Sequence, residues 1–179
     1  MTTSRPVVPD TAILGDAPTA LRWSAENCTL GRAMAVLGEK WTILVLREVF
    51  LGIRRFEDLR VRTGIPRQVL TNRLATLVGH GILRRHPYQL PGVRARDEYR
   101  LTEKGFELYP ILAALLTWGD RHLGDPDGPA LRLTHRDCAA AVTVELRCAH
   151  GHRVTPRETV PRPGPGARPR RQDPATESA

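Results

Sequence analysis

Apolar residues recur at the spacing of an α-helix through much of the segment from residue 28 to residue 123. The first predicted helix begins near Cys28 and ends at Gly38, with its apolar residues on one face. The next stretch, EKWTILVLREVFLG, is apolar on nearly every side. Such a helix should be buried, and we expect it between the helices that follow and another layer or subunit.

A tight turn joins two further helical patterns, one over residues 56–62 and the other over Pro66–Val78. Gly64 can adopt the positive φ that closes the first of these helices. Pro66 suits the first turn of the second helix, where a missing N–H costs no hydrogen bond. The buried face of the second helix consists of apolar residues at i, i+4 and i+7, namely Leu70, Leu74 and Leu77. Two short helices around such a turn indicate a helix-turn-helix.

Two extended segments follow the helix-turn-helix. Residues 82–88 are predicted to form a strand, residues 89–95 a loop around Pro91-Gly92, and residues 96–101 the returning strand. This hairpin would be the wing of a winged helix-turn-helix. The predicted fold class is therefore mainly α with a small β-hairpin wing and, further along the chain, a short C-terminal β appendage.

A last helical pattern covers residues 102–123, with Thr102 as its N-cap. Pro110 lies inside this pattern and should kink or split the helix. A terminal helix this apolar, in so small a domain, favours pairing with a second copy of the chain over a purely intramolecular role. We expect a homodimer formed through the N-terminal helix and the 102–123 helix.

Four regions are predicted along the chain. They are a loose N-terminal arm (residues 1–27), the winged-helix DNA-binding and dimerisation domain (28–124), a small β extension (125–160) and a disordered tail (161–179). Within the extension, Leu131–Leu133 and Val142–Arg147 are predicted to be short strands, because the second of them alternates strictly between apolar and polar residues.

The chain of 179 residues carries a formal net charge of +8, and most of the excess lies in the predicted domain. Residues 28–124 hold sixteen Lys and Arg against nine Asp and Glu. From Arg60 to Arg96 there are eight arginines and no acidic residue. This distribution is typical of a protein that binds a polyanion, and the alternative is a solvated basic surface.

The candidate contacts to double-stranded DNA lie on the outer face of the second helix and on the wing. They are Arg67, Gln68, Thr71, Asn72, Arg73, Arg84, Arg85, Arg94 and Arg96. The polar side chains of the helix can donate and accept hydrogen bonds at base edges and phosphates. The wing arginines suit phosphates or an adjacent minor groove, because a guanidinium is a planar fork of donors.

Other functions find less support in the sequence. The six histidines are scattered, without a nucleophile–base spacing or a phosphate-binding glycine loop, so we expect neither an enzyme nor a cofactor. A winged-helix module that docks a protein would present a less basic recognition face. An RNA-binding protein would expose more aromatic side chains than Tyr88 near the basic surface. The absence of a secretory signal and of a bilayer-spanning apolar run predicts a cytoplasmic protein.

The run GEKWTILVLREVFLGIRRFEDLRVRTGIPRQVLTNRLATLVGHGILRR, with the later YRLTEKGFELYPILAALLTWGDRH, resembles the HxlR-type winged helix-turn-helix regulators of bacteria. The resemblance covers about residues 28–123, and its motifs fall in order: GEKWT, LRE, RRF, VLTNRL and LTEKG. It implies a homodimer with a basic wing that regulates transcription at pseudo-palindromic operators, and we expect a repressor. The family often has a Ser after Gly-Ile, where this chain has Pro66; the helix can still begin there, but one hydroxyl contact is lost.

Cys28 stands where many members of that family carry a cysteine, which in some of them acts as a thiol-based sensor. The dipole of a helix favours the thiolate of a cysteine near its N-terminus, which raises reactivity. The resemblance therefore implies that Cys28 is a candidate redox sensor, with an oxidant or a small molecule as effector. The alternative is an inert, half-buried thiol.

A second group of nitrogen and sulfur side chains lies in the extension. His135, Cys138, Cys148 and His152 follow the order H-x2-C-x9-C-x3-H and are of the kinds that zinc prefers. The paired C-x-x-C motifs of a zinc ribbon are missing, so we favour a small β appendage with incidental His and Cys and predict no metal.

Overall fold

The computed structural model describes residues 24–89, 91–92 and 95–169, which divide into two units. One unit spans Leu30–Val144, and the other combines the residues up to Thr29 with the segment from Glu145 onward. The outer parts of the predicted N-terminal arm and C-terminal tail, residues 1–23 and 170–179, lie outside the described residues.

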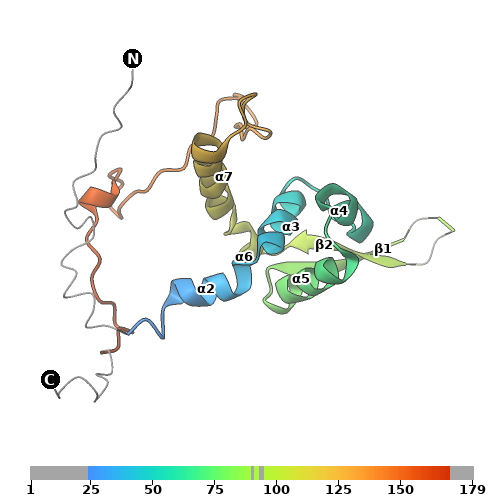
Figure 1. Cartoon of the computed structure of the whole chain (residues 1–179), viewed down its shortest axis with the longest axis horizontal. Coiled ribbons are helices and arrows are strands. Elements are labelled where there is room, and N and C mark those ends of the chain that lie inside the picture. Colours follow the sequence, from blue (N-terminus) through green and yellow to red (C-terminus); the bar gives the residue numbers. More distant parts are fainter. Residues whose placement is uncertain (1–23, 90, 93–94, 170–179) are drawn as a thin grey trace. The chain divides into compact units, whose positions relative to one another are not determined.

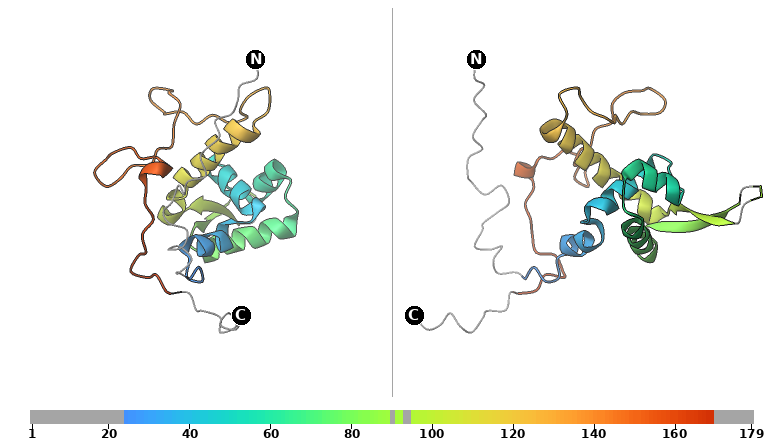
Figure 2. Two further views of the ribbon diagram at one scale, coloured as in Figure 1. Left: turned by 60° about the vertical axis from the view of Figure 1, so that its left-hand side comes forward. Right: turned by 45° about the vertical axis from the view of Figure 1, so that its right-hand side comes forward.

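The elements that precede the extension form a helical domain with one hairpin. In chain order they are α2 (Thr29–Leu37), α3 (Lys40–Phe50), α4 (Phe56–Thr63), α5 (Arg67–Gly79), β1 (Leu83–Tyr88), β2 (Arg96–Leu101), α6 (Glu103–Phe106) and α7 (Tyr109–Leu123) (Figure 1). β1 and β2 pair antiparallel, from Leu83 opposite Leu101 to Tyr88 opposite Arg96. The hairpin projects beyond α4 and α5 as a wing (Figure 2). The predicted mainly α fold with a β-hairpin wing is confirmed.

The turn between α4 and α5 has the predicted chemistry. Gly64 adopts φ = 68°, in the left-handed region, and its N–H donates to the carbonyl of Arg60 at 2.9 Å. Ile65 then points into the core, where it is 1% exposed. Pro66 lies immediately before the first residue of α5, so this helix begins one residue later than predicted and also ends one residue later.

The core lies where α3, α4, α5 and the base of the wing meet. Its most deeply buried apolar side chains are Val45, Leu46, Leu59, Ile65, Leu70, Leu74, Leu77 and Leu83. The three leucines predicted for the inner face of α5 are all in this set. Burying them fixes the rotation of α5, which in turn leaves its polar side chains facing solvent.

A buried charge connects α3 to α4. The side chain of Glu48 is fully buried, and its carboxylate accepts a hydrogen bond from Nε of Arg47 at 2.8 Å and from Nε of Arg62 at 3.1 Å. Both guanidinium groups are partly exposed. The ion pair between Glu48 and Arg62 joins α3 to α4, the first helix of the helix-turn-helix, whereas Arg47 belongs to α3 itself.

The predicted terminal helix is split into α6 and α7, as expected from the proline in its sequence. Pro110 lies in the first turn of α7, where it costs no hydrogen bond. Thr102 caps α6, because its hydroxyl accepts from the N–H of Gly105 at 3.1 Å. α7 packs on α3, with the rings of Phe50 and Tyr109 5.2 Å apart.

The two strands predicted after α7 are replaced by isolated bridges. Thr134 pairs with Ala141 in one tight loop, and Arg147 pairs with Arg153 in another. Nearly all side chains in this region are exposed. A bridge of one residue pair buries no apolar face, so nothing stabilises a longer β-ladder in this region. The alternation at 142–147 reflects local composition rather than a half-buried strand.

Candidate nucleic-acid interface

The outer face of α5 carries a row of exposed polar side chains. Arg67, Gln68, Thr71 and Asn72 are exposed, and Arg73 is half-buried. The amide of Gln68 donates to Oδ1 of Asn72 at 3.0 Å, and the hydroxyl of Thr71 donates to the carbonyl of Arg67 at 3.0 Å. Among the described residues, the amide nitrogen of Asn72 has no hydrogen-bond acceptor, so its donors are available. Such a face can hydrogen-bond to base edges in a major groove.

Arginines from three elements meet beside this face. A groove of about 710 Å³ runs between the start of α5 and the wing. Arg67 of α5, Arg85 of β1 and Arg96 of β2 all line it. These three residues were predicted from the sequence, and the fold brings them together although they are up to 29 positions apart. The arginines of the groove outnumber its acidic residues, and guanidinium groups suit the phosphate backbone of DNA.

The remaining predicted wing residues are placed differently. Arg84 points to the opposite side of β1 from Arg85, because successive side chains of a strand alternate. It lies with Arg54 and Arg100 in another hollow, which also borders Phe50. Arg84 is therefore separated from the groove that contains Arg67. Arg94 lies outside the described residues.

Arg55 lines the same groove and was missed in the sequence. Its backbone bridges to Glu98 of β2, and its guanidinium lies 4.7 Å from the centre of the Tyr88 ring. Cation–π stacking of this kind holds the side chain against the wing. The available signal was its position in the basic pair that precedes α4, but only the fold shows that this pair runs alongside β2.

Acidic residues also line this groove, namely Glu57 and Asp58 of α4 and Asp97 of β2. The sequence contains no Asp or Glu between Arg60 and Arg96, but the turn places Glu57 of α4 against Arg67. The side-chain hydrogen bond from Arg60 lowers the pKa of Glu57, and the charges of Arg67 and Arg96 add to this effect. The carboxylate is therefore ionised at neutral pH. An acid-free sequence stretch did not produce an acid-free surface.

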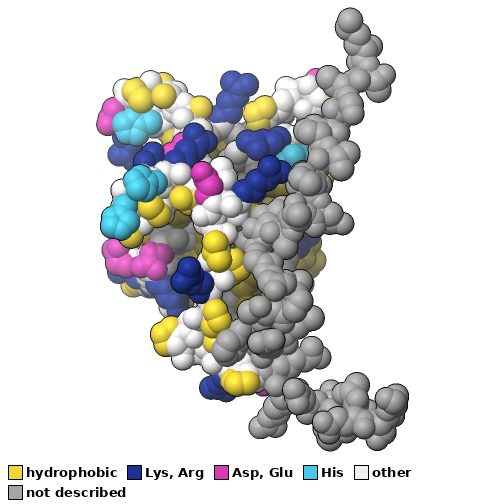
Figure 3. All heavy atoms as spheres, turned by 90° about the vertical axis from the view of Figure 1, so that its left-hand side faces the viewer, with side chains coloured by type: hydrophobic (Ala, Val, Ile, Leu, Met, Phe, Trp, Pro, Cys, Tyr) yellow, Lys and Arg dark blue, Asp and Glu magenta, His cyan; other side chains and the backbone are white. Residues whose placement is uncertain are grey.

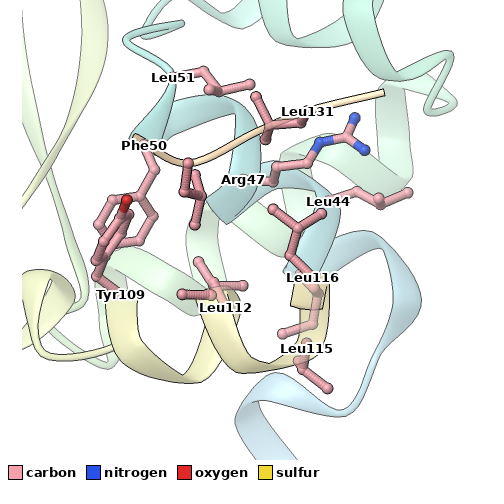
Figure 4. Close-up of a pocket in the computed structure, with 12 residues that line it drawn as sticks. Leu44, Arg47, Phe50, Leu51, Tyr109, Leu112, Leu115, Leu116 and Leu131 are labelled. Carbon is pink, nitrogen blue, oxygen red and sulfur yellow. The ribbon is translucent and has the colours of Figure 1, made fainter. Parts of the chain in front are cut away.

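A second surface, on the other side of α3, is apolar. On the face shown in Figure 3, hydrophobic side chains reach the surface between the basic ones. A groove of about 280 Å³ lies between α3, α7 and the segment around Leu131, with Leu112, Leu115 and Leu116 along one wall (Figure 4). Further along α7, Trp118 is 57% exposed, and Leu30 of α2 is 69% exposed. Large apolar side chains that are exposed in this way favour an interaction surface.

The other candidate site residues are more isolated. Cys28 is exposed and directly precedes α2. In the loop after α7, Nδ1 of His135 lies 3.2 Å from Sγ of Cys138. Among the described residues, no three His, Cys, Asp or Glu side chains are grouped so that they could hold a metal ion. That the His and Cys side chains of the extension bind no metal therefore stays a prediction.

Comparisons with known proteins agree with this geometry. The family model of the HxlR-like helix-turn-helix matches residues 36–127. An HTH-type transcriptional regulator of Mycobacterium tuberculosis, itself uncharacterized, is 44% identical over 142 residues, which are 79% of this chain and 89% of the relative. An alignment of that length does not fit within residues 1–127, so the similarity continues past the family domain.

Solved structures give the same result. PA1607, which has been assigned as a transcription factor, superposes with a TM-score of 0.67 at 32% identity over 75% of this chain and 93% of its own. PA1374 of Pseudomonas aeruginosa, with the same assignment, superposes with a TM-score of 0.55 at 32% identity over 79% of this chain and 95% of its own. Within the described residues, the helices are all too short or too polar to cross a membrane.

Proposed function

The chain belongs to the HxlR-like helix-turn-helix family of transcriptional regulators, and from this premise we propose that it is a homodimeric repressor that reads a pseudo-palindromic operator with α5 and the wing. Family membership makes it a DNA-binding regulator rather than an enzyme. Repression would follow when a dimer bound across a promoter excludes RNA polymerase.

The observation that carries the proposal is the meeting of Arg67, Arg85 and Arg96 in one groove beside the exposed polar face of α5. If α5 enters the major groove of DNA, the adjacent phosphates would lie along the arginine-lined groove of the protein. Asn72, whose amide nitrogen is available, would then face base edges. The side-chain amide of an Asn can form two hydrogen bonds with the edge of an adenine, one as donor and one as acceptor.

The exposed apolar surface supports the dimer. Leu115 and Trp118 on α7, together with Leu30 and Met34 on α2, are each at least 50% exposed. Burying such side chains in a second copy would recover roughly 25 cal/mol for each Å² removed from water. We propose that these two helices form a two-fold interface. Two recognition helices would then read two half-sites about one turn of DNA apart.

The decisive test is DNA binding by the purified full chain, with duplexes selected from a random pool. We expect salt-sensitive binding with two chains per selected site. Asn72→Ala should weaken binding to the selected site by about 1–3 kcal/mol and leave scrambled DNA nearly unaffected. Arg85→Ala should weaken binding to both DNAs and reduce the slope of log K against log salt by about 1 for each bound chain, or about 2 for a dimer. Fluorescence anisotropy at several salt concentrations measures both quantities.

Arg84→Ala is the matched control for the wing, because it removes the same charge from the opposite side of the strand. It should reduce affinity less than Arg85→Ala does. Equal losses for the two variants would contradict the assignment of the groove to phosphate. If the chain enriched no duplex at any salt concentration, the operator-binding proposal would fail, and a protein-docking role for the winged helix would replace it.

A second candidate function is redox sensing through Cys28, favoured by its exposure directly before α2. If its symmetric copy lies nearby in the dimer, hydrogen peroxide would oxidise two thiols to one disulfide, releasing two waters. We expect a dimer band on a non-reducing gel after peroxide treatment, together with a change in operator affinity. Cys28→Ser should abolish both effects, whereas Cys138→Ser should abolish neither. Loss of neither effect in Cys28→Ser would exclude this role.

A further inference from the structure

We infer that the Glu57 carboxylate determines how strictly the protein selects its DNA site, by occupying the fork of Arg67 and opposing phosphate in the groove. This inference rests on the proposed DNA-binding function and assigns a role to a residue that would not itself contact a base. It depends on three observations: the geometry of the Glu57–Arg67 pair, its exposure and its position in the groove.

The pair has a defined geometry. Oε1 of Glu57 accepts hydrogen bonds from both Nη1 and Nη2 of Arg67, each at 2.9 Å. Oε2 accepts from Nε of Arg60 at 2.8 Å. The guanidinium of Arg67 also lies 5.1 Å from the centre of the Phe56 ring. Arg67 is thus held at the start of α5 by a carboxylate and an aromatic ring.

The occupied edge of Arg67 is the one that DNA would need. The two Nη atoms form the fork that pairs with the O6 and N7 atoms of guanine or with two phosphate oxygens. In the free protein, Glu57 fills that fork. Any DNA that uses it must displace the carboxylate, which remains in the groove as a negative charge.

This displacement is feasible because the pair is exposed. The side chains of Glu57 and Arg67 are 45% and 66% exposed, so solvent screens their attraction and the pair contributes little to stability. Arg67 can therefore exchange its partner when a better acceptor arrives. The same exposure means that replacing Glu57 should leave the fold intact.

The effect differs between specific and non-specific DNA. Non-specific binding depends almost entirely on phosphate charge, so a fixed carboxylate in the phosphate groove weakens it. At the correct site, base contacts of α5 repay the cost of releasing Arg67. Glu57 should therefore lower affinity for random sequences more than affinity for the operator. Like-charge opposition of this kind is a recognised source of specificity.

The experiment compares Glu57→Gln with the wild type on the selected duplex and on its scrambled counterpart. Glu57→Gln removes the charge but keeps the size of the side chain. We expect affinity for scrambled DNA to rise about tenfold and affinity for the selected duplex to rise about two- to threefold. The ratio of the two affinities should therefore fall about three- to fivefold. The salt slope on scrambled DNA should steepen by about 1 for each bound chain, as a freed arginine reaches phosphate.

Two controls separate this role from a general charge effect. Glu107→Gln makes the same charge change at an exposed residue that forms no ion pair among the described side chains and does not line the groove. It should leave the affinity ratio unchanged. In an Arg67→Ala background, Glu57→Gln should alter the ratio clearly less than it does in the wild type, because only the repulsion between the carboxylate and phosphate remains.

An unchanged ratio in Glu57→Gln would overturn the inference, and so would a fall of the same size in Glu107→Gln. These results would leave the proposed function intact, because the wild type would still select its duplex. If the wild type selected no duplex, both the proposed function and this inference would fall together.

Discussion

Gly105→Ala should destabilise the domain by about 3 kcal/mol, although it adds only one methyl group. A Cβ built on Gly105 would lie 2.3 Å from the carbonyl oxygen of Ile82 and 3.0 Å from Cδ2 of Leu101. The carbonyl belongs to the backbone and cannot rotate away. It is also held in place, because it accepts hydrogen bonds from the N–H and the hydroxyl of Thr102, both at 3.1 Å. The base of the wing would have to separate from α6.

Gly79→Ala is the control for this prediction. Gly79 is the last residue of α5, is exposed, and would place its Cβ where no heavy atom lies within 4 Å. Adding a methyl group there should be neutral or should stabilise the protein by less than about 1 kcal/mol. Urea unfolding of both variants measures the difference. Similar free energies of unfolding for the two variants would show that the close approach at Gly105 is not sterically critical.

The steric requirement at Gly105 also explains a motif that the sequence could only match by resemblance. In LTEKG, Thr102 caps α6, and its hydroxyl also donates to the carbonyl of Gly81, just before β1. Gly105 allows α6 to approach the carbonyl of Ile82. The N-cap role of Thr102 was predictable, because capping is a local interaction. The role of Gly105 was not, because its neighbour Ile82 is 23 positions earlier in the chain.

The same distinction between local and distant contacts separates the rest of the predictions. The turn at Gly64, the helix after Pro66 and the pairing of residues 83–88 with 96–101 follow from local signals, and the structure confirms them. The side of the wing on which each arginine lies depends on strand register and on which face packs against α5. The sequence prediction placed Arg84 and Arg85 in one set of contacts, because composition alone cannot show that they lie on opposite sides of the wing.

The acidic residues were the least predictable part of the interface. Glu57 is ten positions from Arg67, and only the tight turn between α4 and α5 brings them together. The burial of Glu48 also escaped the hydrophobic pattern, since periodicity assigns a charged residue to the solvent face of a helix. Both carboxylates restrain arginines of the helix-turn-helix, one at its surface and the other beneath it. The net charge of the DNA-binding unit therefore conceals two carboxylates that position its arginines.

Removing both partners of Glu48 should destabilise the protein more than removing the carboxylate itself. In Arg47→Ala/Arg62→Ala, the fully buried carboxylate would lose both hydrogen-bonding cations, and such an uncompensated charge costs about 3–5 kcal/mol. Neither arginine needs the carboxylate in the same way, because both guanidinium groups reach solvent. The free energy of unfolding from urea titrations measures the loss.

Adding Glu48→Met to this double variant should restore most of the lost stability, because an apolar side chain of similar length fills the site without a charge. The triple variant lacks both ion pairs that Glu48 forms, so its recovery would separate the cost of the buried charge from the benefit of the contacts. If the triple variant were as unstable as the double variant, the ion pairs themselves would be the source of stability. In that case the connection between α3 and the helix-turn-helix would depend on attraction across the helices rather than on avoiding an unpaired charge.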